Sequence, residues 1–334
     1  MDKVKWGVLS TAKIGLTQVI PALQASEHAT VAAIASRGEA AAQAAAASLG
    51  IPKAYGSYEE LLADPEIEAV YNPLPNHLHL PWSLKALGAG KHVLCEKPLT
   101  LDVGEAALLA EASSRAGRLV AEAFMVRHHP QWRMVRDIVA SGRIGEARVV
   151  QTVFSYFNDD PSNIRNRADM GGGGLYDIGC YAINTARYLF DGEPERVVGL
   201  FDTDPALGTD RLMSGMAAFP GNRHLAFTCS TQLSPCQHVR VLGTSGRIEI
   251  AVPFNAAAGA PTRIAVDDGR DLLGGGRDEI EIEPCDQYTL QGDAFSRAVR
   301  GGEPLEWGIA DAVLNMRVID AFFRSARSAG WEQP

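Results

Sequence analysis

A lysine, an aspartate and a tyrosine are the residues of this chain best suited to proton transfer. Lys97 stands in the Cys-Glu-Lys-Pro run at 95–98, and Asp177 and Tyr181 follow the four glycines at 171–174. We expect a helix over Asp177 and Tyr181, and residues four apart on a helix share a face, so both side chains can point into one site. A tyrosine can give or take a hydroxyl proton, and a nearby ammonium can favour its phenolate and polarise a carbonyl. These residue types suit proton transfer coupled to hydride transfer.

The turn after the first apolar run has the composition of a nucleotide-binding loop. Ser10, Ala12 and Gly15 occupy the three places of a G-x-G-x-x-G pattern directly after Val4–Leu9. Small residues there permit a tight turn and let a pyrophosphate approach a helix N-terminus. An ordinary strand–helix turn would also tolerate them, but their place in the first strand–helix unit favours cofactor binding. The residues that we expect around the cofactor here are Ser10, Thr11, Ala12 and Ile14.

The end of the second apolar run indicates which cofactor is bound. An NAD enzyme often carries an acidic residue there to bind the adenosine ribose, whereas this chain has Ser36 and Arg37. An arginine beside a serine can hold a 2′-phosphate. Glu39 lies nearby, and we interpret it as a solvated residue in the first turn of the next helix. The sequence therefore predicts NADP, with NAD as the less favoured cofactor.

The composition excludes several classes of protein. The chain has 334 residues, 46% of them hydrophobic and 21% charged, which is ordinary for a globular enzyme of two domains. A formal net charge of -9 argues against a broad surface for nucleic acid or anionic membranes. No run approaches the roughly eighteen apolar residues of a membrane span, and no signal-peptide pattern opens the chain, so we expect a cytoplasmic protein. The five scattered cysteines suggest neither disulfides nor a zinc site, and the histidines lack partners at metal-ligand spacing, so no metal is expected.

Short apolar runs alternate with helical stretches in the first third of the chain, which predicts a doubly wound parallel sheet in a dinucleotide-binding domain over residues 1–123. The expected strands are Val4–Leu9, Thr30–Ala35, Ala69–Tyr71, His92–Cys95 and Leu119–Ala121. The expected helices are Glu39–Leu49, Ser57–Ala63, Pro81–Leu87 and Val103–Ala116. Pro21 interrupts the first helical pattern, so that helix should be kinked there or restart with Pro21 in its first turn.

From about Phe124 the strands follow one another without helices between them, which predicts a mainly antiparallel sheet in an α+β domain over residues 124–334. The expected strands are Val149–Tyr156, Glu195–Thr203, Leu212–Phe219, Leu225–Gln232, Val239–Leu242 and Ile248–Val252. The residues at 221–222 and 244–246 are typical of hairpin turns. We expect an exposed loop over 256–276 and two closing helices, Thr289–Val299 and Ile309–Ser325.

Four segments carry a resemblance to a known family. They are Trp6–Gly15, Tyr71–His79 with a Pro-Asn-x-x-His motif, Ala89–Pro98 with a Glu-Lys-Pro motif, and Gly171–Asn184. Together they resemble the glucose–fructose oxidoreductase / inositol dehydrogenase family of NAD(P)-dependent sugar oxidoreductases, over both domains. The spacing of Asp177 and Tyr181 is most similar to that of NADP-dependent aldose (D-xylose) dehydrogenases, glucose–fructose oxidoreductase and dimeric dihydrodiol dehydrogenase. The inositol dehydrogenase branch typically has a histidine in place of the tyrosine.

This resemblance implies a Rossmann domain followed by an open, mostly antiparallel sheet that often mediates assembly into a homodimer or homotetramer. It implies that Lys97, before a cis proline bond, and Tyr181 serve catalysis, with Tyr181 the proton donor or acceptor. Asp177 would position the substrate, a small sugar or polyol. Further cofactor contacts would come from Pro75, Asn76, His79, Glu96 and Lys97.

Alternatives to these roles remain open from the sequence. Asp177 could cap a helix and Tyr181 could be a packing residue, while Arg165 and Asn163 could contact sugar hydroxyls or brace a loop. The favoured function is an NADP-dependent sugar dehydrogenase. It oxidises an aldose at its C1 hydroxyl group and so converts the sugar to a lactone. The alternatives are a sugar–sugar oxidoreductase that keeps NADP bound, a keto-sugar or dihydrodiol oxidoreductase, and a non-catalytic NADP-binding sensor.

Overall fold

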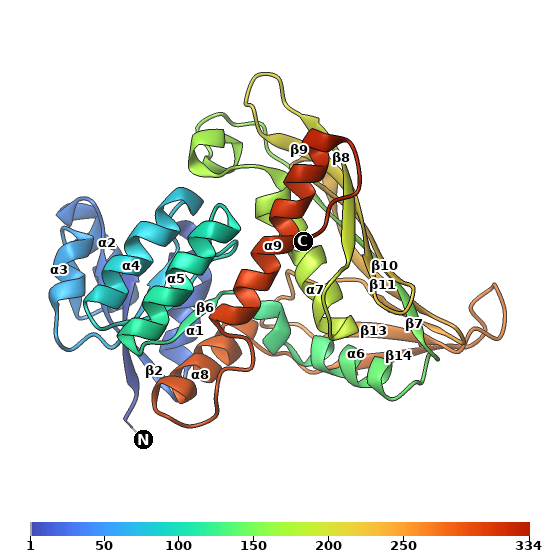
Figure 1. Ribbon diagram of the computed structural model, residues 1–334. Coiled ribbons are helices and arrows are strands. Elements are labelled where there is room, and N and C mark those ends of the chain that lie inside the picture. Colours follow the sequence, from blue (N-terminus) through green and yellow to red (C-terminus); the bar gives the residue numbers. More distant parts are fainter. Residues whose placement is uncertain (1) are drawn as a thin grey trace. The chain divides into compact units, whose positions relative to one another are not determined.

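The chain folds into two compact units, seen in a computed structural model that describes residues 2–334 (Figure 1). The first unit comprises the residues up to 125 together with Tyr288–Met316, and the second comprises Val126–Gln287 with Arg317–Pro334. The sequence predicted two consecutive domains, 1–123 and 124–334. The structure divides the chain close to that position, but the segment 288–316 belongs to the first unit and not to the second.

The packing of α8 (Gln287–Val299) explains why this late segment joins the first unit. The ring of Phe295 lies 5.3 Å from that of Trp6, measured between centroids, and the indole N–H of Trp6 donates to the hydroxyl of Ser296 over 3.1 Å. Both aromatic side chains are buried. Large aromatic residues bury the most apolar area per side chain, so α8 completes the core of the sheet through a contact between residues 290 positions apart in the chain.

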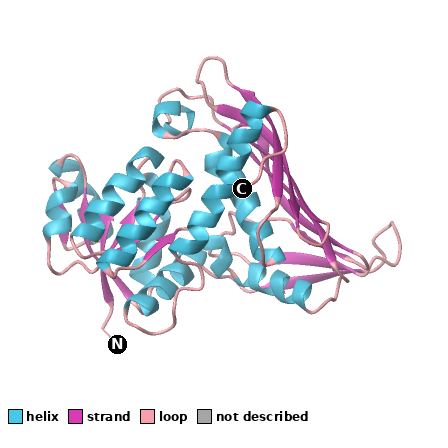
Figure 2. Cartoon of the chain, in the orientation of Figure 1, coloured by secondary structure: helices cyan, strands magenta, loops and turns pink. Residues whose placement is uncertain are grey.

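A six-stranded parallel sheet in the order β3-β2-β1-β4-β5-β6 forms the centre of the first unit, with helices against it (Figure 2). Its strands are β1 (Val4–Leu9), β2 (Ala29–Ala35), β3 (Lys53–Tyr55), β4 (Ala69–Asn72), β5 (His92–Cys95) and β6 (Val120–Glu122). The other helices of this unit are α1 (Ile20–Ala25), α2 (Glu39–Leu49), α3 (Tyr58–Ala63), α4 (His79–Gly88) and α5 (Val103–Ala116). The predicted Rossmann sheet is confirmed, and its strand order reverses between β1 and β4, where open α/β sheets bind ligands.

Local signals determine where the helices of this unit begin and end. Asp102 caps α5 by accepting the N–H of Glu105 over 2.8 Å, and Gly117 ends the helix with a φ of 59°. Gly50 ends α2 in the same left-handed conformation. Gly15–Val19 forms a π-helical turn, after which α1 starts with Pro21 in its first turn, one of the two predicted outcomes.

An eight-stranded sheet in the order β14-β13-β12-β11-β7-β10-β9-β8 forms the second unit. Neighbouring strands are antiparallel except for β7 and β10, so the predicted mainly antiparallel sheet is confirmed. Its strands are β7 (Ala147–Phe157), β8 (Arg196–Thr203), β9 (Asp210–Phe219), β10 (Arg223–Ser230), β11 (Gln232–Gly243), β12 (Arg247–Ile250), β13 (Thr262–Asp267) and β14 (Arg277–Ile282). Its helices are α6 (Pro130–Ala140), α7 (Cys180–Phe190) and the C-terminal part of α9 (Ile309–Ser328). Helix α7 packs on β7 and β10.

The turns of the second sheet agree with the sequence, but one predicted loop is wrong. Gly221 and Asn222 have φ angles of 75° and 56°, and together with Pro220 they form the hairpin turn between the paired residues Phe219 of β9 and Arg223 of β10. The loop predicted over 256–276 instead contains β13, which pairs with β12 and β14. Ile264, Ala265 and Val266 of β13 are buried, but the glycine- and alanine-rich flanks concealed this short apolar run. The strands β3 and β14 were also missed, since one has three residues and the other is largely exposed and charged.

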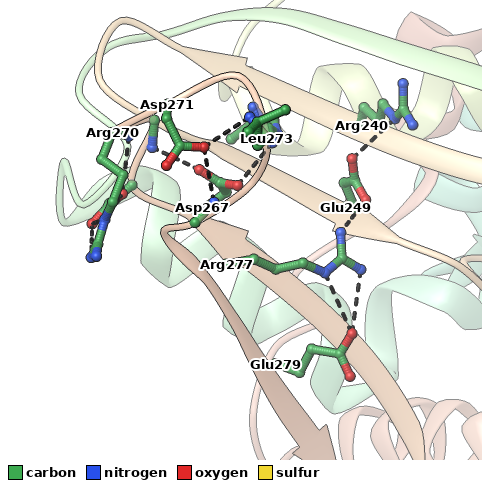
Figure 3. A network of polar contacts seen from close by, with 12 residues as sticks. Arg240, Glu249, Asp267, Arg270, Asp271, Leu273, Arg277 and Glu279 are labelled. Atoms are coloured by element: carbon green, nitrogen blue, oxygen red, sulfur yellow. Dashed lines mark hydrogen bonds and ion pairs between the residues drawn. The ribbon is translucent and has the colours of Figure 1, made fainter.

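One face of the second sheet packs against α7. The opposite, outward face is highly charged at its β11–β14 end (Figure 3). Glu249 lies 3.3 Å from the guanidinium of Arg240 and 2.6 Å from that of Arg277, which also lies 3.4 Å from Glu279. Each such exposed pair contributes at most about 1 kcal/mol to stability. The network leaves this end of the face well solvated and internally neutralised.

Candidate active site

The carboxyl end of β1 leads into a turn that suits the approach of a phosphate. Ser10 has a φ of 79°, in the left-handed region that glycine usually occupies, and its hydroxyl accepts the N–H of Ala12 over 3.2 Å. A helix begins at Lys13, and the first N–H groups of a helix have no intrahelical acceptor, so they can bind an anion. The other predicted cofactor residues of this turn, Thr11, Ala12 and Ile14, are all partly exposed.

Arg37 stands just after the end of β2 without an internal partner. Its side chain is exposed and makes no hydrogen bond or ion pair with any residue from 2 to 334. Ser36 is buried, and its N–H donates to the carbonyl of Tyr55 over 3.1 Å, which holds the end of the strand. Glu39 is exposed and accepts from the amide of Gln43 over 2.9 Å, as expected for a solvated first-turn residue. The guanidinium is therefore available to an external phosphate.

A buried histidine ties together the loops that follow β4 and β5. The ring nitrogens of His79 lie 2.8 Å from the carbonyl oxygen of Pro98 and 2.7 Å from that of Leu74. Two such contacts would suit a doubly protonated ring, but burial lowers the pKa of His79 to about 4. We therefore take the ring as neutral at pH 7, donating to one of the two carbonyls. His79 braces the loop on which Pro75 and Asn76 are partly exposed.

The Glu-Lys-Pro motif lies at the end of β5, beside the end of β4. Glu96 accepts the hydroxyl of Tyr71 over 2.6 Å, and burial raises the pKa of Tyr71, so this tyrosine keeps its proton and donates it. Lys97 is partly buried, and the peptide bond between Lys97 and Pro98 is cis, as the resemblance implied. The motif thus stands at the carboxyl edge of the parallel sheet, where ligands of such sheets bind.

The helix that carries Asp177 and Tyr181 in the second unit is not uniform. Leu175–Gly179 is a π-helical turn, and α7 continues it from Cys180 to Phe190. The sequence predicted an ordinary helix over both residues, whereas Asp177 lies in the π turn and Tyr181 in the first turn of α7. Single π turns inside helices occur frequently at functional sites.

Two donors hold the carboxylate of Asp177. Its Oδ2 accepts the hydroxyl of Tyr156 over 2.5 Å, and its Oδ1 accepts from Nε of Arg165 over 3.0 Å. Burial and the Asp177 charge raise the pKa of Tyr156, so its hydroxyl stays protonated and donates. The Asp177 side chain remains 13% exposed. Tyr156 and Arg165 thus orient a carboxylate, a group that accepts hydrogen bonds from hydroxyl groups.

The ring of Tyr181 is buried among aromatic side chains. Its centroid lies 5.8 Å from that of Phe154 and 5.2 Å from that of Phe254. Packing against these two rings holds the plane of the Tyr181 ring. The direction of its hydroxyl then follows from the position of Tyr181 on the helix. Tyr181 is therefore rigidly placed, as a residue that transfers a proton must be.

The loop residues Arg165 and Asn163 have different roles. Arg165 pairs with Asp177, whereas Asn163 caps a short turn by accepting the N–H of Arg165 over 3.1 Å.

Sequence reasoning missed Tyr156, which reaches Asp177 from β7. Tyr156 is the last residue of the predicted strand Val149–Tyr156, and its position there does not reveal which side chain it meets.

Residues 2–334 lack two features, a cluster of potential metal ligands and a membrane-spanning helix. Within this range no three or more histidine, cysteine, aspartate or glutamate side chains gather so that they could hold a metal ion. None of the helices in the same range combines the length and the apolarity needed to span a bilayer.

The chain belongs to the GFO/IDH/MocA oxidoreductase family. Residues 4–124 match the model of the oxidoreductase family with an NAD-binding Rossmann fold, and residues 132–249 match that of the GFO/IDH/MocA C-terminal domain. It is thus an NAD(P)-dependent oxidoreductase of CH–OH groups, in a family whose members act on sugars and related compounds.

Three relatives show the range of this family. A D-xylose 1-dehydrogenase (NADP(+)) from Haloferax volcanii is 42% identical over 97% of both chains. A 3-ketoreductase from Actinomadura kijaniata, solved with NADP and TDP-benzene, has a TM-score of 0.91 and 30% identity over 97% of this chain and 98% of its own. An aldose–aldose oxidoreductase from Caulobacter crescentus has a TM-score of 0.91 and 27% identity over the full length of both chains. The ketoreductase has also been solved with a tyrosine replaced by phenylalanine and with a lysine replaced by alanine or glutamate.

Proposed function

We propose that this protein is an NADP-dependent sugar dehydrogenase that oxidises the C1 hydroxyl of an aldose to a lactone. The observation that carries the proposal is the carboxylate of Asp177, held by Tyr156 and Arg165 in the turn before Tyr181. A sugar hydroxyl is a donor that such a carboxylate binds well. The similarity to a D-xylose dehydrogenase supports an aldose substrate.

The residues of the first unit fit the proposed cofactor. The Ser10 turn and the helix N-terminus after it suit a pyrophosphate, and the unpaired Arg37 suits a 2′-phosphate. NADP, when bound, supplies the nicotinamide that accepts the hydride. The relatives that use or bind NADP support this choice over NAD.

In the proposed mechanism the side chains of this chain bind the sugar and move its proton. Asp177 accepts a hydrogen bond from a sugar hydroxyl and orients the ring. Tyr181 takes the proton of the hydroxyl whose carbon is oxidised, because hydride loss from carbon requires that this proton leave. Lys97 acts on the same substrate and favours the phenolate of Tyr181 through its positive charge. The substitution of a tyrosine and of a lysine in the related ketoreductase fits these roles.

A panel of aldoses, polyols, keto sugars and dihydrodiols, followed by NADPH absorbance, tests the substrate class. We expect aldoses to be oxidised with NADP, and turnover of dihydrodiols or keto sugars alone would contradict the C1 assignment. The relative that couples two aldoses favours one further candidate, a sugar–sugar oxidoreductase with retained NADP. Nicotinamide in the purified protein and turnover without added cofactor would establish that candidate instead.

Replacement of Arg37 by alanine is expected to weaken NADP binding far more than NAD binding. The variant loses a charge-assisted phosphate contact worth about 1.5–3 kcal/mol, roughly a tenfold to hundredfold change in Kd. Titration of protein fluorescence with each cofactor measures the effect, and Arg115→Ala on the exposed face of α5 is the control. Equal losses for both cofactors would contradict the 2′-phosphate assignment.

We also propose that a second copy of the chain covers the β8–β10 end of the outward sheet face, giving a homodimer or homotetramer. Leu200 on β8 and Met216 on β9 are 77% and 47% exposed there, and the strand order separates them from the charged strands β11 to β14. Exposed apolar patches mark protein interfaces, and a two-fold axis pairs a patch with itself.

Light scattering at micromolar concentration tests this assembly. The wild type should have the mass of two or four chains, and Leu200→Glu should shift it towards the monomer. Leu272→Glu is the matched control, since Leu272 is 98% exposed but lies on the β13–β14 connection. A monomeric wild type would refute the proposal.

A further inference from the structure

The glycine run before the Asp177 turn closes around a buried carboxyl group. Asp210, the first residue of β9, is 7% exposed, and its Oδ2 accepts the N–H of Leu175 over 2.7 Å. The backbone of Gly174 also bonds to this carboxyl group. Gly173 has a φ of 125°, and a Cβ there would clash with Oδ1 of Asp210. The backbone of the glycine run therefore passes close to the side chain of Asp210.

The opposite side of the same run is equally tight. A Cβ on Gly172 would clash with the carbonyl oxygen of Arg165, and the side chain of Arg165 pairs with Asp177. The backbone leading into the π turn is therefore clamped between Asp210 on the sheet and the loop that carries Arg165. Two residues beyond Leu175 comes Asp177, and Tyr181 follows in the next turn.

We propose that Asp210 is a positioning residue, which anchors the glycine run and thereby sets the places of Asp177 and Tyr181 for the reaction. This inference rests on the proposed function, because it assumes that Asp177 and Tyr181 act on the substrate. It adds a residue that touches neither substrate nor cofactor and that no motif of the chain indicated.

The surroundings of Asp210 make this anchor sensitive to pH. Facing it are the N–H groups of Gly174 and Leu175, the carboxylate of Asp177 on the π turn and the thiol of Cys229 on β10. Burial raises the pKa of Asp210 to about 7, although its backbone hydrogen bonds oppose the shift. A raised pKa in the folded state means that the protonated form adds stability below about pH 4, which is lost as the pH rises through about 7.

Ionisation changes how the anchor holds the turn. The ionised carboxylate can accept both N–H groups with either oxygen, whereas the protonated form turns one oxygen into a donor. We therefore expect the wild-type rate to vary with pH around neutrality through the ionisation of Asp210.

The test compares Asp210→Asn with Asp204→Asn. Asparagine nearly preserves the shape of Asp210 and one acceptor for Leu175, but it removes the titration. Asp204 is also a buried aspartate before β9, and its carboxylate accepts from the N–H groups of Ala206 and Leu207 and from the amide of Gln232, none of which belongs to the glycine run. For both variants kcat and KM for the aldose found in the panel are measured from about pH 5 to 9, with NADP affinity and Tm measured in parallel.

We expect Asp210→Asn to lower kcat by roughly tenfold to hundredfold, the cost of misplacing reacting groups, with NADP affinity unchanged. Its pH profile and its Tm should lose the change near pH 7, while Asp204→Asn keeps the wild-type profile. Asp210→Glu keeps the charge and serves if the asparagine variant does not fold; it should lower kcat while retaining the pH change.

A wild-type kcat and pH profile in Asp210→Asn, or equal effects of the Asp204 substitution, would overturn the inference. Tyr181→Phe is assayed beside them. If it loses activity while Asp210→Asn does not, only the positioning role fails; if it stays fully active, the proposed function itself fails.

Discussion

Replacement of Tyr181 by phenylalanine is expected to lower kcat by roughly 10²–10⁴-fold, the usual contribution of a general acid or base. The variant keeps the ring that packs between Phe154 and Phe254 and removes only the hydroxyl. A free tyrosine titrates at about pH 10 and is a poor base at neutral pH, so the proposed help of Lys97 is part of the mechanism. NADP affinity should change little, because the substitution alters none of the proposed cofactor residues, all of which lie in the first unit. Steady-state kinetics and a cofactor titration measure both quantities.

The same substitution at Tyr188 is the matched control. Tyr188 is buried on the same helix, where its ring packs against the guanidinium groups of Arg127 and Arg136. Tyr188→Phe should leave kcat near the wild-type value. If Tyr181→Phe also retained a near-normal kcat with normal cofactor binding, the proton would have to leave through another group, with Lys97 the next candidate.

Replacement of Lys97 by alanine is expected to lower kcat by roughly 10²–10³-fold, the range for removing one preorganised electrostatic contact to a reacting group. The loss has two sources: the phenolate of Tyr181 is no longer favoured, and the developing charge on the sugar oxygen is no longer stabilised. In contrast to Tyr181→Phe, this variant should also weaken NADP binding, since Lys97 is one of the proposed cofactor residues and stands at the carboxyl edge of the parallel sheet. Binding of NADP and single-turnover rates separate the two effects.

Lys85→Ala provides the control for Lys97. Lys85 is an exposed lysine of the same unit, paired with Glu59 on the surface, and its loss should leave both kcat and NADP affinity unchanged. A Lys97→Ala variant with wild-type turnover would remove the lysine from the mechanism and leave only a structural role for the motif.

The sequence determined those parts of the structure that depend on neighbouring residues. The helices α2 and α5 have the predicted bounds because glycines that adopt the left-handed conformation end both of them. The strands β1 and β5 also have their predicted bounds, since a buried parallel strand reads as a continuous apolar run. The motif residues Lys97, Asp177 and Tyr181 could be selected as candidates for the same reason, because motifs of a few residues stay intact along the chain.

Only the tertiary structure decided which side chains meet across long stretches of sequence. Tyr156 reaches Asp177 from 21 residues away, and Asp210 reaches the backbone of Leu175 from 35. Neither contact follows from composition or periodicity, because both depend on which strands are neighbours in the sheet and on where each strand begins. The segment 288–316 belongs to the first unit for the same reason, a contact between distant residues. Phe295 packs against Trp6, and this contact can form only when Trp6 is part of the folded sheet. Local patterns therefore determined the elements and the candidate residues, and the packing of distant elements determined what holds those residues in place.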